Sequence, residues 1–315
     1  MGTTYTLKYM PVTDGPSKEE VEQAVDTELA EVNAQMSTYI ASSELSQFNN
    51  SSSTEWFEVS PDLVQVIEQA QKLSATTGGA FDVTVGPLVD LWGFGPSRSR
   101  DSVPSEHEIS DALQLCGIEH LSTRPMPPAI KKAIPSLRVD LSAIAKGHGV
   151  DRVAAELERM GIRSYFIEIG GEIRAAGAKT HDSPWRAGVE KPIEDGRELL
   201  SAVDLADEAL ATSGNYRNFY EADGKKYWHT LDPRTGLPAR SSVLQASVKA
   251  KTCAEADAIA TAMMVLGEEG LKLAEEQGWS VMLVFASLGS DIEIRATGDL
   301  REAADELATA QVPAQ

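Results

Sequence analysis

Hydrophobic positions recur along this chain with two periods, 3.6 residues in some segments and two residues in others. The longer period predicts amphipathic helices, and the shorter one predicts half-buried strands. The predicted helices lie at 17–32, 61–77, 110–116, 150–160, 254–266 and 268–276. The predicted strands lie at 1–10, 137–141, 164–169, 185–190, 281–285 and 292–296, with one more directly after Gly170-Gly171. This mixture favours an α+β fold.

Turn and loop signals complete the pattern. A hairpin is predicted over 218–232, because alternating residues flank Asp223-Gly224 and tight hairpin turns require positive φ. The glycine-rich run 78–95 predicts irregular backbone, and the polar segment 97–108 predicts a loop. The last dozen residues, about 302–315, are expected to fray. Since the chain has no internal repeat and no long linker, we predict one domain over 1–315.

Composition narrows the class of protein. The chain has 28 Lys and Arg against 48 Asp and Glu, a formal net charge of −20, which argues against a nucleic-acid partner. With 42% apolar residues it can bury a core, and its longest apolar stretches are shorter than the roughly 20 residues that a membrane span needs.

Cys116 and Cys253 have no metal-type spacing, although a disulfide between them stays possible. The first ten residues lack the pattern of a secretion signal, so we expect either a cytoplasmic protein or a chain from which the export signal is missing.

Asp257 and Thr261 lie four residues apart on a predicted helix, so both oxygens face the same volume. Hard oxygen ligands of this kind suit Mg²⁺ or Ca²⁺ better than zinc. The competing interpretation is an acidic residue that complements a helix N-terminus and a threonine that fills a core gap. By spacing alone, that structural interpretation is the more common outcome.

Three further segments have chemistry of their own. The segment 139–147 predicts a strand that leads into a helix, where backbone N–H groups and Lys146 would attract an anion. His229 lies at a predicted strand end, where a side chain can reach a cleft. In 79–82, small residues permit close backbone approach, and Phe81 offers a stacking surface. Each also has a structural alternative. Segment 139–147 would be an ordinary strand-to-helix connection, His229 a packing residue, and segment 79–82 a turn that enters a strand.

The usual nucleotide-binding and hydrolase motifs are missing from the sequence. Taken together, however, the segments above resemble the ApbE family of flavin transferases, enzymes that move FMN from FAD onto a protein hydroxyl. The matching segments are, in order, MGT, MSTY with SEL, GGAFDVTVGPLVDLWGFG, VDLSAIAKGHGVD, FIEIGGEIRAAG, ATSGNYRNF, HTLDPRTG and AEADAIATAMMVLG. They run through most of the chain, so the resemblance does not depend on one motif.

The resemblance implies a fold and an activity. The fold would be a single compact α+β domain, related to the T-fold, with mixed or antiparallel sheets and flanking helices. The activity would be a Mg²⁺-dependent FAD:protein FMN transfer onto a Ser or Thr of a client, a subunit of a membrane redox complex, with release of AMP. FAD would be the substrate. Family members are commonly periplasmic and often lipoproteins, so we expect a periplasmic protein whose precursor is an inner-membrane lipoprotein.

The resemblance also assigns residues to roles. It implies a flavin cleft contacted by Met1, Tyr39, Ala80, Phe81, Asp82, Asp140, Lys146 and Leu231. It implies that Mg²⁺ is held by the carbonyl of Ala143 and by oxygens of Asp257 and Thr261. We expect His229 to take the proton of the acceptor hydroxyl, because neutral imidazole is a usable base near pH 7.

Two other functions stay open at this point. In the first, water replaces the protein hydroxyl, and the chain is an FAD pyrophosphatase that forms FMN and AMP. In the second, the chain is a flavin carrier or electron-transfer flavoprotein that leaves the pyrophosphate intact. Release of AMP separates the second alternative from the others, and a covalently modified acceptor separates transfer from hydrolysis.

Overall fold

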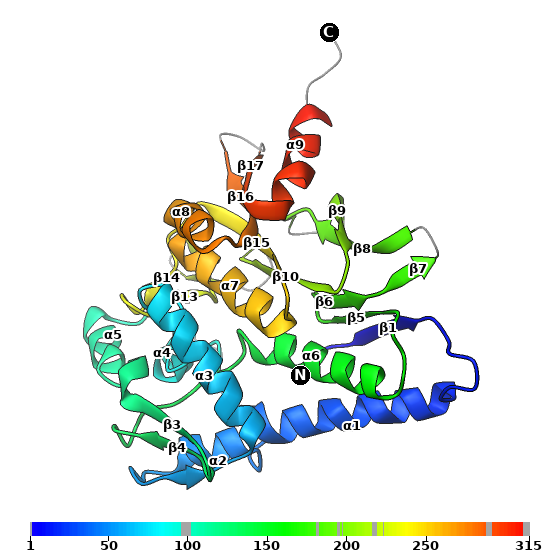
Figure 1. The fold of residues 1–315 in the computed structure, drawn as a ribbon. Coiled ribbons are helices and arrows are strands. Elements are labelled where there is room, and N and C mark those ends of the chain that lie inside the picture. The colour runs from blue at the N-terminus through cyan, green and yellow to red at the C-terminus, as the bar shows by residue number, and fades with distance from the viewer. Residues whose placement is uncertain are drawn as a thin grey trace. The chain divides into compact units, whose positions relative to one another are not determined.

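The computed structural model describes residues 2–95, 102–180, 183–193, 196, 198–215, 219–222, 224–287 and 292–310. Within these residues the chain forms two compact units (Figure 1). The helical unit contains Ala30–Ala145 and Asn218–Arg240, and the sheet unit contains Gly2–Leu29, Lys146–Arg217 and the chain from Ser241 onward. The predicted mixture of helices and antiparallel sheet is confirmed. The expectation of one domain over 1–315 stays a prediction.

The described part of the sheet unit contains a seven-stranded sheet in which every neighbouring pair is antiparallel. In spatial order its strands are β1 (Tyr5–Tyr9), β5 (Tyr165–Ile169), β6 (Glu172–Ala176), β10 (Glu208–Gly214), β15 (Val243–Ala250), β16 (Ser280–Ala286) and β17 (Ile292–Ala296). All five strands of this sheet that the alternation predicted are present. Residues 281–285 of β16 are all buried, which fits its nearly continuous apolar sequence.

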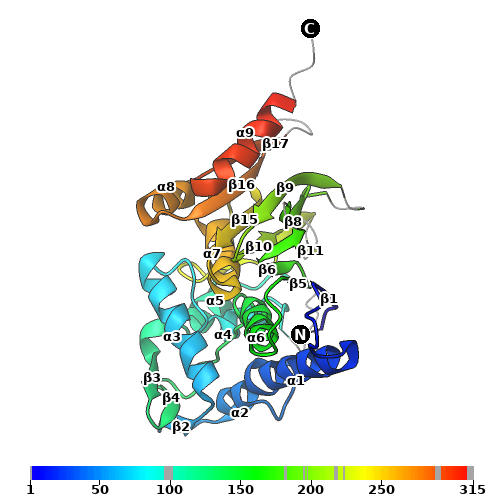
Figure 2. The same cartoon turned by 45° about the vertical axis from the view of Figure 1, so that its right-hand side comes forward.

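Among the described residues, five α-helices belong wholly or mainly to the sheet unit: α1 (Lys18–Met36), α6 (Ala145–Arg159), α7 (Cys253–Leu266), α8 (Glu268–Gln277) and α9 (Arg301–Ala310). In Figures 1 and 2, α7 lies along β10 and β15. Its residues are buried around nearly the whole helix, and Thr252 caps its N-terminus by accepting from the Glu255 N–H. The predicted helices at 150–160, 254–266 and 268–276 are therefore confirmed.

A smaller three-stranded sheet lies in the same described part of the sheet unit, formed by β7 (Ala178–Thr180), β8 (Ser183–Glu190) and β9 (Leu199–Leu205). The segment expected to fray, about 302–315, begins within α9, and its fraying stays a prediction. Leu300 and Ala304 are buried in one cluster with Trp185 and Leu205. Apolar side chains along one face thus dock this helix against β9 and β17.

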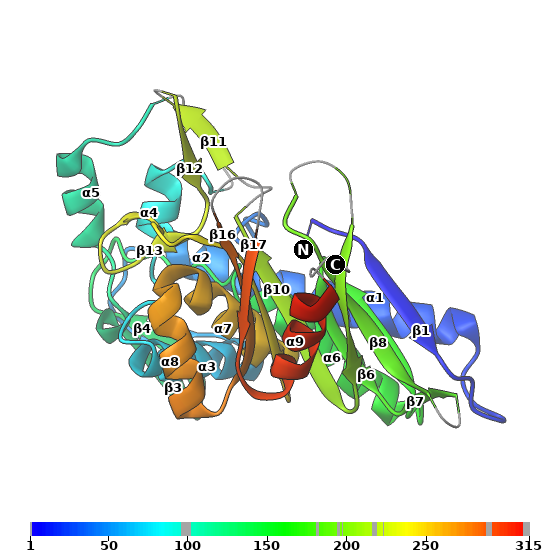
Figure 3. The same ribbon diagram turned by 90° about the horizontal axis from the view of Figure 1, so that it is seen from above.

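The helix α1 (Lys18–Met36) begins in the sheet unit, and its last residues, from Ala30 onward, lie in the helical unit. The other helices of the helical unit are α2 (Glu44–Asn50), α3 (Pro61–Thr76), α4 (Gly86–Leu91) and α5 (Glu106–Leu113). Its strands are β2 (Phe57–Glu58), β4 (Pro128–Lys132) and β3 (Leu121–Pro125) in one sheet, the hairpin β11 (Phe219–Ala222) and β12 (Lys225–Trp228), and the pair β13 (Leu231–Asp232) and β14 (Leu237–Pro238). Figure 3 shows the predicted β11–β12 hairpin. Gly224 lies in its turn with φ 70°.

Two expectations for the helical unit are wrong. Within the run 78–95, expected to be irregular, 86–91 forms α4, which begins at a glycine followed by a proline that suits the first turn. The helix expected at 110–116 is α5, which begins at Glu106 because Ser105 and Glu108 form a reciprocal capping box. Part of the segment expected to be a loop is therefore helical.

The strand expected at 137–141 is not part of a sheet, and its only bridge among the described residues joins Arg138 to Val85. Side chains take the place of a neighbouring strand. The amide of Asn49 donates to the Val139 carbonyl and accepts from the Val139 N–H, both at 2.8 Å. The buried Lys132 Nζ donates to the Leu137 carbonyl at 3.2 Å. The alternating sequence therefore forms an extended segment that is held by an amide and an ammonium.

Replacing Asn49 with alanine should lower the free energy of unfolding by about 2–4 kcal/mol, because two buried backbone groups lose their partners. Urea unfolding of the purified protein measures the change. The matched control is Asn50→Ala, since Asn50 is the next residue of α2 and is exposed. Equal effects at the two positions would contradict the role of the Asn49 amide.

Candidate functional site

Three ionisable side chains gather where α6 begins in the sheet unit. The Nζ of Lys146 lies 2.5 Å from Oε1 of Glu172, the first residue of β6. Asp257 of α7 accepts from the Gly147 N–H through Oδ2 at 3.1 Å. Glu172 is 2% exposed and Asp257 is 3% exposed, whereas a third of the Lys146 side chain is exposed. The cluster therefore has a buried acidic side and a partly open basic side.

Gly147 makes this cluster sterically feasible. A Cβ at this position would lie 2.3 Å from the carbonyl oxygen of Cys253, which is a backbone atom at the start of α7. Glycine therefore lets the first turn of α6 approach α7 closely enough for its N–H to reach Asp257. The Lys-Gly pair in the sequence thus has two functions: the lysine supplies the charge and the glycine allows the contact.

Burial and mutual charge shift the pKa values of all three side chains. Burial and then the charge of Asp257 raise the pKa of Glu172 to about 8, against the opposing effect of Lys146. Burial also raises the pKa of Asp257, although Lys146 and the Gly147 N–H oppose it. Burial lowers the pKa of Lys146, but Asp257 and Glu172 outweigh this effect, so its net shift is upward. When all three are ionised, two carboxylates face one ammonium, and the site favours additional positive charge.

The donor atoms fit a hard divalent cation. Thr261 lies one helical turn after Asp257, and its Oγ1 is 3.3 Å from the Ser213 Oγ. Oε2 of Glu172 is buried and has no hydrogen-bond partner among the described residues. Carboxylate and hydroxyl oxygens are ligands typical of Mg²⁺ and Ca²⁺. The residues with described positions contain no group of three or more His, Cys, Asp or Glu that could hold a metal, so a cation here would need other oxygens as well.

Glu172 should also make the stability of the metal-free protein depend on pH. Its pKa rises from an ordinary value of 4.5 to about 8 on folding, so between these pH values the folded state keeps a proton that the unfolded chain has lost. Stability therefore falls as pH rises through this window, and the loss is complete above about pH 8. Melting temperatures in EDTA should agree for wild type and Glu172→Gln near pH 5 and diverge toward pH 9, with the variant higher. Parallel curves would contradict this prediction.

In the helical unit, Asp82 organises the loop before α4. Its Oδ1 accepts from the N–H and the hydroxyl of Thr84, each at 2.7 Å, and its Oδ2 accepts from the Ile118 N–H at 3.0 Å. Burial raises the pKa of Asp82 in spite of these bonds. Ala80 and Phe81, which precede it, are 1% and 2% exposed. The sequence expectation of a stacking surface on Phe81 thus falls on a buried ring.

Three other predicted residues of the helical unit, Tyr39, Asp140 and Ala143, lie in loops. Asp140 donates through its N–H to the Val83 carbonyl at 2.7 Å, and its Oδ1 accepts from the Ser142 N–H at 2.8 Å. Ala143 follows in the turn that precedes α6. Tyr39 is 72% exposed, and its N–H donates to the Ser37 hydroxyl. Asp140 and Ala143 thus share one short segment, directly after the extended segment held by Asn49.

His229 follows directly after β12, and its ring meets Phe94 edge to face with centroids 6.3 Å apart. The loop that follows is anchored to α4, because Trp92 donates from its indole Nε1 to the Gly236 carbonyl at 2.8 Å. Leu231 is 7% exposed and packs in the same apolar cluster as Trp92. His229 therefore precedes a loop that is held by a hydrogen bond to Trp92, and the side chain of Leu231 packs in the apolar core.

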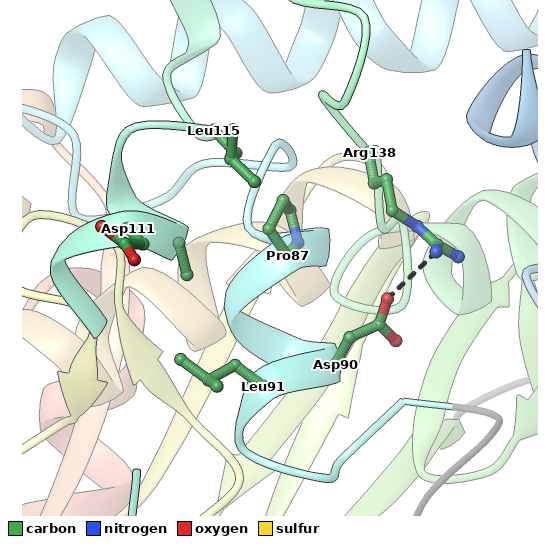
Figure 4. Close-up of a pocket in the computed structure, with 7 residues that line it drawn as sticks. Pro87, Asp90, Leu91, Asp111, Leu115 and Arg138 are labelled. Atoms are coloured by element: carbon green, nitrogen blue, oxygen red, sulfur yellow. Dashed lines mark ion pairs between the residues drawn. The ribbon is translucent and has the colours of Figure 1, made fainter. Parts of the chain in front are cut away.

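A pocket of the helical unit has a volume of about 360 Å³. Figure 4 draws the residues that line it. The residues that line it are Pro87, Asp90, Leu91, Asp111, Ala112, Leu115 and Arg138. Arg138 Nη1 and Asp90 Oδ2 form an ion pair at 3.3 Å on its wall. None of the candidate site residues predicted from the sequence is among those that line this pocket.

The predicted site residues thus divide between the units. Lys146, Asp257 and Thr261 lie in the sheet unit, where the structure places Lys146 and Asp257 in one cluster with Glu172. The others that the structure describes lie in the helical unit: Tyr39, Ala80, Phe81, Asp82, Asp140, Ala143, His229 and Leu231. Met1 lies outside the described residues. Their roles in flavin and metal binding stay predictions.

Sequence reasoning missed Glu172 and Ser213. The sequence signal that could have identified Glu172 is a charged residue at the start of a largely buried strand.

Cys116 and Cys253 are both buried and free, which answers the question of a disulfide between them. Burial raises the pKa of the Cys116 thiol to about 12, so it is not an activated nucleophile. None of the helices that the structure describes is long and apolar enough to cross a bilayer.

Comparison with known proteins identifies the family. The model of the ApbE family matches residues 1–283. An FAD:protein FMN transferase of Vibrio cholerae is 46% identical over 285 residues, which cover 90% of this chain and 85% of the relative. The FAD:protein FMN transferase of Escherichia coli strain K12 is 34% identical over 287 residues, with 90% and 82% covered.

Solved structures agree with this result. The flavin transferase ApbE from Vibrio cholerae matches with a TM-score of 0.88 and 42% identity over 96% of both chains. The apo form of Pseudomonas stutzeri flavinyl transferase ApbE matches with a TM-score of 0.87 and 38% identity, over 99% of this chain and 95% of that one. With these matches and the site described above, the chain belongs to the ApbE family.

Proposed function

We propose that this chain is an FAD:protein FMN transferase. The observation that carries the proposal is the cluster at the start of α6, where two buried carboxylates and one ammonium favour additional positive charge beside a threonine hydroxyl. Relatives at 46% and 34% identity over nine tenths of the chain are named for this activity. A donor set of hard oxygens suits a magnesium-bound pyrophosphate, the group that links the two halves of FAD.

The cation would be held by Asp257 and Thr261, together with the carbonyl of Ala143. When bound, it neutralises phosphate charge and makes the pyrophosphate easier to break. Lys146 adds a second positive charge on the open side of the cluster. These local charges are needed, because a protein with a net charge of −20 repels an anionic dinucleotide at long range.

The protein's own groups then position the reactants. His229 accepts the proton of the acceptor Ser or Thr hydroxyl, and the hydroxyl oxygen forms a bond to the FMN-side phosphorus. The bond from this phosphorus to the bridging oxygen breaks, and AMP leaves with that oxygen. Phosphoryl transfers of this kind depend mostly on positioning and on charge stabilisation.

The client and the location belong to the same proposal. The acceptor is a Ser or Thr in a short motif of a membrane redox-complex subunit, and the protein acts in the periplasm, with an inner-membrane lipoprotein as its precursor. Support for both comes only from the resemblance to the family.

Incubation of the purified protein with FAD, Mg²⁺ and an acceptor peptide tests the proposal. Transfer gives a peptide that gains the mass of an FMN phosphodiester, as seen by mass spectrometry, together with one AMP per modified peptide. FMN and AMP without a modified peptide would support a pyrophosphatase instead. FAD that stays intact and bound, without AMP, would support a carrier or an electron-transfer flavoprotein.

A further inference from the structure

Glu172 is the buried ionisable group of the cluster that the proposed mechanism does not use. It begins β6 directly after Gly170 and Gly171, whose φ values of 64° and 104° turn the chain back from β5. Its backbone is paired with Ile169 of β5, and the next residue, Ile173, is paired with Leu210 of β10. The carboxylate is therefore fixed by the central part of the sheet.

Lys146 contrasts with this rigid carboxylate. A third of its side chain is exposed, and its four side-chain torsions rotate freely unless the ammonium is held. Glu172 Oε1 accepts from the Lys146 ammonium at 2.5 Å, while Asp257 is bonded to the Gly147 N–H. A rigid, buried carboxylate thus holds the ammonium of a side chain that is one-third exposed.

We infer that Glu172 is a positioning residue that fixes the Lys146 ammonium for contact with the phosphates of the dinucleotide. The inference rests on the proposed function, and it adds a residue to which the proposed mechanism assigns no contact with flavin or metal. Folding does not account for this carboxylate, because it is 2% exposed, close to a second acid, and half of its hydrogen-bonding capacity is unused among the described residues. Such a costly group is typical of a functional site.

The sign of the effect separates positioning from simple charge. When it is ionised, Glu172 adds negative charge near a site for an anionic substrate. If charge were its only effect, its removal would improve the binding of FAD. If it positions Lys146, its removal weakens FAD binding and slows transfer, although a repulsive charge has been taken away.

The test uses Glu172→Leu and Glu172→Gln in the full chain, with Glu168→Gln as the matched control on the neighbouring strand β5. Oε1 of Glu168 accepts from the nearby Gly171 N–H at 3.2 Å. In Glu172→Leu, kcat/KM for FAD should fall about 10- to 100-fold, mostly through KM, while KM for the acceptor peptide stays the same. Glu172→Gln keeps an acceptor oxygen and should recover part of the loss.

Melting temperature distinguishes a positioning role from a structural one, because loss of a structural residue would lower it. In EDTA near pH 8, both variants should melt at or above the wild-type temperature, because a buried carboxylate with an unfavourable charge has been removed. Unchanged or improved kcat/KM in Glu172→Leu overturns the inference. A melting temperature that falls together with activity also overturns it, since Glu172 would then be structural.

Labelling of lysines in the metal-free protein keeps this inference separate from the proposed function. An N-hydroxysuccinimide ester should modify Lys146 faster in Glu172→Leu than in wild type, relative to the exposed Lys272 in the same chain. Equal labelling means that Glu172 does not hold the ammonium, and the inference fails while the proposed function stands. A second outcome is possible, in which Lys146 is labelled faster in Glu172→Leu but the wild-type protein does not transfer FMN. The ion pair then exists, but the proposed function is overturned, and the role of the pair in that function is overturned with it.

Discussion

Replacing His229 with alanine is expected to slow FMN transfer by roughly 10²- to 10⁴-fold, the usual contribution of a positioned general base. The affinity for FAD should change little, because the imidazole acts on the acceptor hydroxyl and not on the dinucleotide. Single-turnover transfer to an acceptor peptide measures the rate, and quenching of flavin fluorescence measures the affinity. A rate equal to that of wild type would remove His229 from the mechanism.

The fold around His229 makes this result interpretable. The loop that follows His229 is held by the hydrogen bond from the Trp92 indole to the Gly236 carbonyl, in which the imidazole takes no part, so alanine should leave that loop in place. His107→Ala is the matched control, because His107 lies in the same unit and 86% of its side chain is exposed. Added imidazole should restore part of the rate in His229→Ala alone, which distinguishes a lost base from a distorted site.

Local signals predicted the elements whose ends are set by nearby residues. Ser60 and Pro61 predicted the start of α3, and the structure shows Ser60 accepting from the Leu63 N–H. The Asp223-Gly224 pair predicted the β11–β12 hairpin. In both cases the deciding interaction lies within a few residues of the signal, so the sequence alone was sufficient.

Elements that depend on distant partners could not be predicted in this way. The segment 137–141 has the alternation of a strand, but its partner is the Asn49 side chain, 90 positions earlier. The helix α9 has an amphipathic sequence of its own, but its position depends on burial of Leu300 and Ala304 against the distant strands β8 and β9. Tertiary contacts therefore override the local strand pattern at 137–141 and fix the position of α9.

The site shows the same division. The spacing of Asp257 and Thr261 was visible, because one helix turn separates them. Glu172 was not, because a glutamate after two glycines reads as a surface turn until the sheet buries it. The chemistry of the cluster arises from three chain segments that meet only in the folded unit, namely those of Lys146, Glu172 and Asp257.

Asparagine in place of Asp257 is expected to reduce magnesium-dependent transfer by at least about 10³-fold, since a metal ligand that stabilises phosphate charge is worth several kcal/mol. The fold should survive, because the asparagine side-chain oxygen can still accept from the Gly147 N–H. Metal-free stability should not fall, because burial raises the pKa of Asp257 and its removal takes away an unfavourable charge.

Magnesium titrations of the transfer rate and calorimetric titrations of Mg²⁺ measure the loss directly. Glu255→Gln is the control on the same helix, since Glu255 is an exposed acid two residues away and changes the net charge equally. If Asp257→Asn still transferred FMN and EDTA still abolished that activity as in wild type, the cation would bind elsewhere. The buried carboxylates would then be a purely electrostatic feature of the sheet unit. Loss of both magnesium binding and transfer in Asp257→Asn, with Glu255→Gln unaffected, would place the cation at the start of α6.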